Sequence, residues 1–110
     1  MQNVYDLAHE MARSLKETDQ YINYKKATEA INANEQLKKM IDDFTALNMQ
    51  AQTAMMTGQQ PDAELQQKLQ ATYAIVMSDP TCANYLNSQM AFSTVLTDIY
   101  QILGEAIDVK

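Results

Sequence analysis

The stretch Asp79–Leu103, DPTCANYLNSQMAFSTVLTDIYQIL, decides the fold expected for this chain. Asp79 is a suitable N-cap residue and Pro80 suits the first helical position, so the pattern predicts a helix over residues 80–107. No charged residue lies between Asp79 and Asp98, although a helix face in water usually carries charge. The sequence therefore predicts a long helix that is covered on more than one side.

The apolar residues of this last helix occupy more of its circumference than one neighbouring helix covers. They are Phe92, Val95, Leu96, Ile99, Tyr100, Ile102, Leu103 and Ile107. At 1.5 Å per residue the helix is ~40 Å long, whereas a compact domain of this size has a radius of gyration of ~13 Å. Self-association through long helices, with methionines filling irregular gaps, is the favoured interpretation. A monomeric bundle with a central last helix is the alternative.

Four further helices are expected before the last one. Apolar residues at helical spacing, capping residues and the turn TGQQPD at residues 57–62 place them over residues 3–16, 19–33, 35–57 and 61–77. The chain has only two glycines and two prolines, and few helix breakers favour long helices. Its 110 residues suit one domain. The predicted fold is all-α, with a single helical domain over residues 1–110 that forms a bundle of long helices.

Composition and charge restrict the classes of function. The net charge of −6, from 14 acidic and 8 basic residues, repels phosphate backbones and disfavours broad nucleic-acid binding. No run approaches the ~20 apolar residues that cross a bilayer, and the first residues carry acids without the apolar core of a signal peptide. Cys82 is the only cysteine, so a reducing cytoplasm is the simplest location.

The segment TDQYINYKKATEAI, residues 18–31, sets two tyrosines beside two lysines and raises the question of a base-stacking surface. Tyr21 and Tyr24 share one helix face, whereas Lys25 and Lys26 project mostly elsewhere. A stacking surface needs aromatic and cationic side chains on the same exposed face. We therefore expect the tyrosines to pack in a core or interface. The only basic cluster, a weak candidate patch for RNA, is Lys25, Lys26, Lys38 and Lys39.

Side chains that could carry chemistry are few and scattered. His9 is the only histidine, and a metal site needs several converging ligands. Asp42 and Asp43 are adjacent and diverge by ~100° on a helix, so they do not form an acid–base pair. A helix start could lower the pKa of Cys82, but a buried, inert thiol is the favoured interpretation. No P-loop, dinucleotide-binding or nucleophile motif is present, so we expect no enzymatic activity, no metal and no cofactor.

The chain resembles the YlbF/YmcA-like (YheA) family of small bacterial all-helical proteins in four segments. They are NVYDLA at residues 3–8, YKKATEAI at residues 24–31, the TGQQPD turn, and YLNSQ…LTDIYQIL at residues 85–103. The resemblance covers essentially the whole chain and implies long helices that intertwine into a homodimer. It also implies a non-enzymatic regulatory subunit. The better understood members associate with a third protein and influence phosphorelay signalling, competence, biofilm formation and messenger-RNA processing through a membrane ribonuclease.

Those members also contribute cysteines to iron–sulfur clusters, which normally need several thiolate ligands. Cys82 is the only thiol of this chain. In this respect the chain is similar to the branch of the family that lacks the cluster-ligating cysteines.

These patterns predict a cytoplasmic, non-enzymatic protein-interaction module that pairs with a second copy and with another protein, as a regulatory or accessory subunit. Two alternatives stay open. One is an RNA-processing accessory factor that acts through a nuclease complex or the basic patch, and the other is a helical protein with a small ligand in an interhelical apolar pocket. Direct nucleic-acid binding and membrane insertion are not expected. The residues expected at the core or interface are Phe44, Leu47, Met55, Tyr85, Phe92, Leu96, Ile99 and Leu103.

Overall fold

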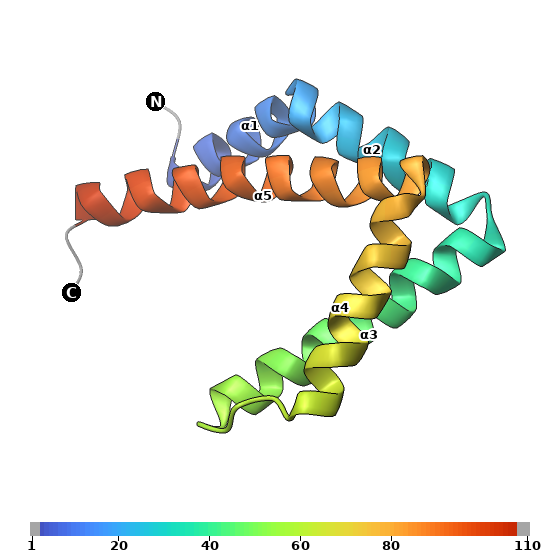
Figure 1. The fold of residues 1–110 in the computed structure, drawn as a ribbon. Helices are drawn as coiled ribbons and strands as arrows, with labels where there is room; N and C mark the ends of the chain where they lie inside the picture. The colour runs from blue at the N-terminus through green and yellow to red at the C-terminus, as the bar shows by residue number, and fades with distance from the viewer. Residues whose placement is uncertain (1–2, 108–110) are drawn as a thin grey trace. The chain divides into compact units, whose positions relative to one another are not determined.

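The computed structural model describes residues 3–107 and forms five helices over that range (Figure 1). They are α1 (Val4–Lys16), α2 (Asp19–Asn32), α3 (Glu35–Met56), α4 (Ala63–Ser78) and α5 (Pro80–Ile107). None of the described residues is in a strand. The predicted all-α fold of long helices is confirmed, and pairing with a second copy stays a prediction.

Side-chain caps fix the starts of all five helices. Each capping oxygen accepts hydrogen bonds from N–H groups that the first helical turn leaves without a backbone partner. The donor–acceptor distances lie between 2.7 and 3.2 Å. The caps and the residues whose backbone N–H groups donate to them are Asn3 with Asp6, Thr18 with Tyr21, Asn34 with Gln36 and Leu37, Asp62 with Leu65, and Asp79 with Thr81 and Cys82.

The start of α4 differs from the expectation by two residues. The sequence predicts a helix from Pro61, whereas α4 begins at Ala63. The reason is that the Asp62 carboxylate accepts the Leu65 N–H at 2.7 Å and sets the N-cap at residue 62. Pro61 then precedes the cap, and its carbonyl accepts a hydrogen bond from the Gln66 side-chain amide at 3.0 Å.

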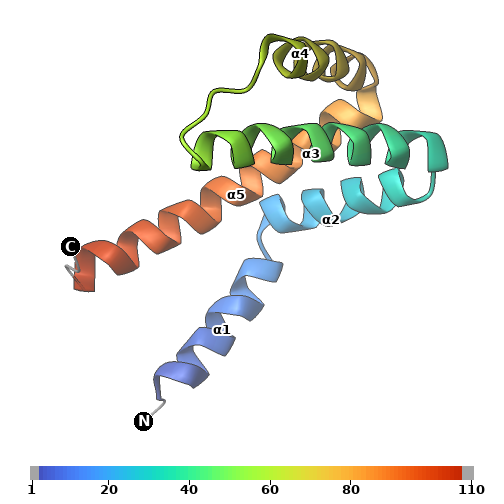
Figure 2. The same cartoon turned by 90° about the horizontal axis from the view of Figure 1, so that it is seen from below.

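A six-residue connection joins α3 to α4, and the two helices lie side by side in both views (Figures 1 and 2). Gly58, with φ of +82°, ends α3. Its N–H donates to the Met55 carbonyl at 3.1 Å, and the Gln59 N–H donates to the Ala54 carbonyl at 2.9 Å. This pair of hydrogen bonds is a Schellman motif, which requires the left-handed conformation that glycine adopts without strain.

The contacts of the chain divide it into two compact units. Among the described residues, the first unit comprises residues 3–28 and 85–107, and the second comprises residues 29–84. The prediction of a single domain over the whole chain stays a prediction. The buried side chains are Ala27 and Ser88 in the first unit, and Ile31, Ile41, Phe44, Val76 and Cys82 in the second.

Candidate functional site

A cluster of aromatic rings holds α2 against α5 within the first unit. The Tyr21 ring lies edge-on to the Phe92 ring with 5.5 Å between centroids. The Tyr24 ring lies 5.8 Å from that of Tyr85 and 6.0 Å from that of Phe92. Aromatic pairs at these separations are favourable beyond the apolar area that they bury. The expectation that Tyr21 and Tyr24 pack, rather than present their faces to bases, is confirmed.

The apolar stripe of α1 is uncovered along most of its length. We call Val4, Leu7, Ala8, Met11 and Leu15 the α1 stripe. No residue of α1 is buried, and exposure decreases along the stripe from Val4 at 70% through Leu7 at 50% to Leu15, which is partly buried. Such a stripe normally faces a core.

The end of α5 carries a second uncovered apolar surface. Tyr85, Phe92, Leu96 and Ile99 are partly buried. Beyond Ile99, by contrast, every residue from Tyr100 to the end of the helix is exposed. The apolar members of this exposed end are Tyr100, Ile102, Leu103 and Ile107.

A third exposed set lies on α3 in the second unit. Met49 and Met56 are seven residues apart, so they share one helix face. Met55 is a neighbour, and all three are more than 60% exposed. No charged residue occurs between Asp43 and Asp62. Methionine side chains of this kind adapt to varied partner surfaces.

The structure separates the eight residues expected at a core or interface into three environments. Phe44 is buried, and its ring lies 5.8 Å from that of Tyr73 across α3 and α4. Met55 and Leu103 are exposed. Their assignment as interface residues stays a prediction. The remaining five, Leu47, Tyr85, Phe92, Leu96 and Ile99, are partly buried.

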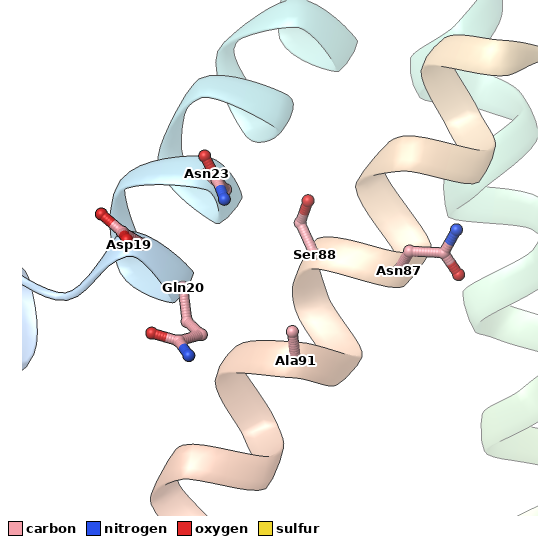
Figure 3. Close-up of a pocket in the computed structure, with 6 residues that line it drawn as sticks. All are labelled: Asp19, Gln20, Asn23, Asn87, Ser88 and Ala91. Atoms are coloured by element: carbon pink, nitrogen blue, oxygen red, sulfur yellow. The ribbon is translucent and has the colours of Figure 1, made fainter.

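A small polar cleft lies between α2 and α5 within the first unit (Figure 3). Its volume is about 240 Å³. The Ser88 hydroxyl lies on the side of α5 that is nearer α2, whereas the Asn87 amide points away from α2 (Figure 3). Ser88 is 8% exposed, and its hydroxyl both donates and accepts hydrogen bonds. The lining residues are Asp19, Gln20, Asn23, Asn87, Ser88 and Ala91.

The sequence interpretation did not identify this cleft. Amide and hydroxyl side chains follow no motif, and the two halves of the cleft come from opposite ends of the chain. One signal was present, because Ser88 interrupts the apolar spacing that runs through Tyr85 and Phe92.

The four lysines of the basic cluster are all exposed and belong to different units. Lys25 and Lys26 are in the first unit, whereas Lys38 and Lys39 are in the second. The Lys39 ammonium donates a hydrogen bond to the Asp43 carboxylate at 2.9 Å. That hydrogen bond and the charge of Asp43 raise the pKa of Lys39. The pair leaves Lys39 less able to contribute a free positive charge to an RNA surface.

The thiol of Cys82 is fully buried in the second unit. Burial raises its pKa, and the negative charge of the neighbouring Asp79 raises it further. The Asp79 carboxylate accepts the Cys82 N–H at 3.0 Å. Because a thiolate is the reactive form, the protonated Cys82 is held as an inert apolar side chain, as the favoured interpretation expects.

Within residues 3–107, no three His, Cys, Asp or Glu side chains converge in a way that could hold a metal ion. His9 is exposed on α1. No helix in the same range is both long enough and apolar enough to cross a membrane.

A protein-family model described as "Control of competence regulator ComK, YlbF/YmcA" matches residues 4–108 of this chain. Curated relatives are similar over almost their whole length. A UPF0342 protein of Caldicellulosiruptor saccharolyticus is 36% identical over 110 residues, which is 100% of this chain and 92% of the relative. A UPF0342 protein of Leuconostoc citreum is 34% identical over 105 residues, 96% of this chain and 89% of the relative.

Two solved structures share the fold. One is a protein of unknown function (DUF964) from Bacillus stearothermophilus, with a TM-score of 0.83 and 14% identity over 97% of this chain and 94% of that one. The other is Bacillus subtilis RicA in complex with RicF, with a TM-score of 0.64 and 16% identity over 96% of this chain and 93% of that one. At these identities the likeness shows the fold alone.

Proposed function

This chain belongs to the YlbF/YmcA family, and from that premise we propose that it is a non-enzymatic protein-interaction module of the cytoplasm. It pairs with a second copy, and the pair serves another protein as a regulatory or accessory subunit. One solved structure with this fold holds RicA in complex with RicF, and such a protein–protein assembly supports this kind of role. The family description as a control of a competence regulator supports the regulatory part.

One observation carries the proposal. Among the described residues, fifteen large apolar side chains are exposed, whereas six apolar residues are buried. Single exposed apolar residues are ordinary in proteins, but uncovered apolar surfaces along whole helix faces mark interaction sites. The α1 stripe, the end of α5 and the methionines of α3 are three such faces.

Self-association is tested by light scattering over a dilution series. We expect a mass near twice 12.4 kDa. Leu103→Asp should shift the equilibrium to the monomer, because a carboxylate would enter an apolar interface. Gln101→Asp places the same charge two residues away, on the opposite side of α5, and should leave the dimer intact. A monomer at all concentrations for the unaltered chain would contradict the homodimer.

The role toward another protein is tested by crosslinking in cells followed by capture of the chain. Met56 is 87% exposed, so Met56→Asp should not disturb the fold. We expect the unaltered chain to capture another protein that the Met56→Asp variant does not capture. The two purified proteins should also bind each other. Capture of the chain itself and nothing else would contradict the accessory role.

The polar cleft favours a second candidate, the binding of a small ligand that has both polar groups and apolar surface. Its hydroxyl and amide groups can exchange hydrogen bonds with such a molecule. A thermal-shift screen of small metabolites tests it, with Ser88→Ala as the variant that removes the buried hydroxyl. A ligand that stabilises the unaltered chain and the variant equally would not be bound in this cleft.

A further inference from the structure

Ser88 carries a buried hydroxyl group that has no hydrogen-bond partner within residues 3–107. The residue is 8% exposed. Other helical hydroxyls of the chain bond to their own helix: those of Thr28 and Thr94 donate to backbone carbonyls four residues earlier, at 2.8 and 3.0 Å. Because buried polar side chains are nearly always paired, the unpaired hydroxyl of Ser88 points to a partner from outside the chain.

The Ser88 hydroxyl opens into the polar cleft of the first unit. Within the part of the chain that the structure describes, no side-chain oxygen or nitrogen is both fully enclosed and without a partner. The Ser88 oxygen therefore keeps contact with the open space of the cleft, which Ser88 lines. It lies on the side of α5 that is nearer α2 (Figure 3). A hydroxyl offers one donor and two acceptor lone pairs, so a molecule in the cleft meets a polar group that is already held in place.

Small side chains on α5 leave the space of the cleft, and amide side chains on α2 face the same space. Ser88 and Ala91 are separated by about one helical turn, and so are Gln20 and Asn23. All four residues line the cleft. The Gln20 and Asn23 amides each supply a carbonyl acceptor and an NH₂ donor. The lining therefore complements a ligand that both donates and accepts hydrogen bonds.

The charge of the lining disfavours an acidic ligand. None of the lining residues is basic, and Asp19 contributes a carboxylate. The net charge of the whole chain, −6, has the same sign. An anion in the cleft would find no cationic partner and would be repelled by this charge. The ligand that fits is uncharged or basic.

The dimensions of the cleft favour a stretch of extended chain over a free small molecule. Its volume of about 240 Å³ is below the ~300–1,000 Å³ of pockets that enclose most of a small ligand, and it is open to solvent. The lining spans residues 19–23 of α2 and residues 87–91 of α5, which is about 6 Å along each helix. An extended chain advances ~3.3 Å per residue. The cleft therefore matches two residues of a chain that continues beyond it.

We propose that the polar cleft binds an extended peptide segment of the partner protein, one without acidic side chains, and that Gln20, Asn23 and Ser88 hydrogen-bond to the backbone of that segment. Each peptide group presents an N–H donor and a C=O acceptor, which an amide side chain can match with its own acceptor and donors. A basic side chain in the segment gains attraction from Asp19. The inference rests on the accessory role proposed above and names the chemistry of the partner at this site.

Nuclear magnetic resonance titration of the isotope-labelled full chain tests the inference with tripeptides that are acetylated and amidated at their ends. We expect Ala-Lys-Ala to shift the signals of the cleft residues, and Ala-Glu-Ala to bind at least about fivefold more weakly. Ser88→Ala should weaken the binding of Ala-Lys-Ala about fivefold, through the loss of one hydrogen bond. Ser93→Ala removes an exposed hydroxyl of the same helix outside the cleft and should leave the affinity unchanged.

Ala91→Leu fills the cleft without removing a polar group and should abolish binding. No shift of the cleft signals with up to ~10 mM Ala-Lys-Ala would overturn the inference, as would shifts that persist in Ala91→Leu. Equal binding of Ala-Glu-Ala would overturn the exclusion of acidic segments. N-methylacetamide carries one peptide group without a chain, and equal affinity for it would overturn the peptide segment in favour of a free small ligand.

Capture from cells separates the inference from the accessory role on which it rests. We expect Ala91→Leu to capture less of the partner protein than the unaltered chain does. Equal capture by both would overturn the inference and leave the accessory role standing. Capture of no other protein by the unaltered chain would overturn the accessory role, and the inference with it.

Discussion

The ring of Tyr24 stacks on the ring of Phe92, with 6.0 Å between centroids and 24° between planes. Tyr24 belongs to α2 and Phe92 to α5, so this contact joins segments from opposite ends of the chain. Tyr21 and Tyr85 extend the same cluster. Because both tyrosines of α2 contribute their rings to it, the stability of the first unit should depend on these side chains.

Tyr24→Ala should lower the free energy of unfolding by ~2 kcal/mol. The substitution removes two ring contacts from a partly buried site, so the loss should be smaller than for a fully buried aromatic residue. Urea denaturation at one fixed protein concentration measures it, since the apparent stability of a dimer depends on concentration. Tyr24→Phe keeps the ring and should change stability much less. An equal loss in both variants would assign the effect to the hydroxyl group instead of the ring.

Substitution of each of the two glycines by alanine should change the stability of the protein in opposite directions. Gly58 has φ of +82° and no neighbouring atom within 4 Å of an added Cβ, so Gly58→Ala should cost ~1 kcal/mol through backbone strain alone. Gly104 lies inside α5 with the same open space. Gly104→Ala should therefore stabilise the protein by roughly 0.5–1 kcal/mol. Thermal unfolding of both variants checks the pair. A stabilising Gly58→Ala would show that the turn does not hold the left-handed conformation in solution.

Local chemistry explains which parts of the fold the sequence predicts well. The starts of α1 at Asn3 and of α5 at Asp79 are predicted correctly. In both, the capping side chain and the backbone amides that donate to it lie within three residues of each other. The start of α4 is predicted two residues early because Pro61 and Asp62 both favour a helix start. The hydrogen bond from Leu65 to Asp62 decides between them.

Contacts between distant segments account for what the sequence does not predict. Asn23 and Ser88 both line the polar cleft, yet neither residue type signals a site at its own position. The α1 stripe shows a related difference. Its period predicts a covered helix face, whereas the structure leaves that face largely exposed. A sequence period identifies an apolar face but not the chain that covers it.

We expect the purified protein to bind RNA with a dissociation constant of ~10⁻⁴ M or higher at physiological salt. This value is the weak end of the range for non-specific binding. The net charge is −6, and Lys39 is paired with Asp43. Filter binding or polarisation with a single-stranded RNA measures the affinity. Tight, salt-sensitive binding would contradict this expectation. It would support the RNA alternative if the double variant Lys25→Glu, Lys26→Glu weakened the binding and Lys68→Glu, outside the cluster, did not.

The buried thiol of Cys82 should make the free energy of unfolding decrease at alkaline pH. Burial raises the pKa of Cys82 in the folded chain, whereas an unfolded cysteine has a pKa of ~8.5. Below pH ~8.5 the thiol is protonated in both states, so it contributes no pH dependence. As the pH rises above ~8.5, the unfolded chain releases the proton first, and the free energy of unfolding falls by at most ~1.4 kcal/mol per pH unit until the folded thiol also ionises.

Denaturation of the unaltered chain and of Cys82→Ala between pH 7 and pH 10 isolates this effect, because lysines and tyrosines titrate equally in both proteins. We expect the difference in unfolding free energy between the two proteins to be constant at neutral pH and to change above pH ~8.5, with the unaltered chain losing stability relative to the variant. Labelling by a thiol reagent gives an independent readout, since the buried Cys82 should react only as fast as the second unit opens. Rapid labelling of the native protein at pH 7 would show a thiol that is accessible and ionised, and would contradict its role as an inert part of the core.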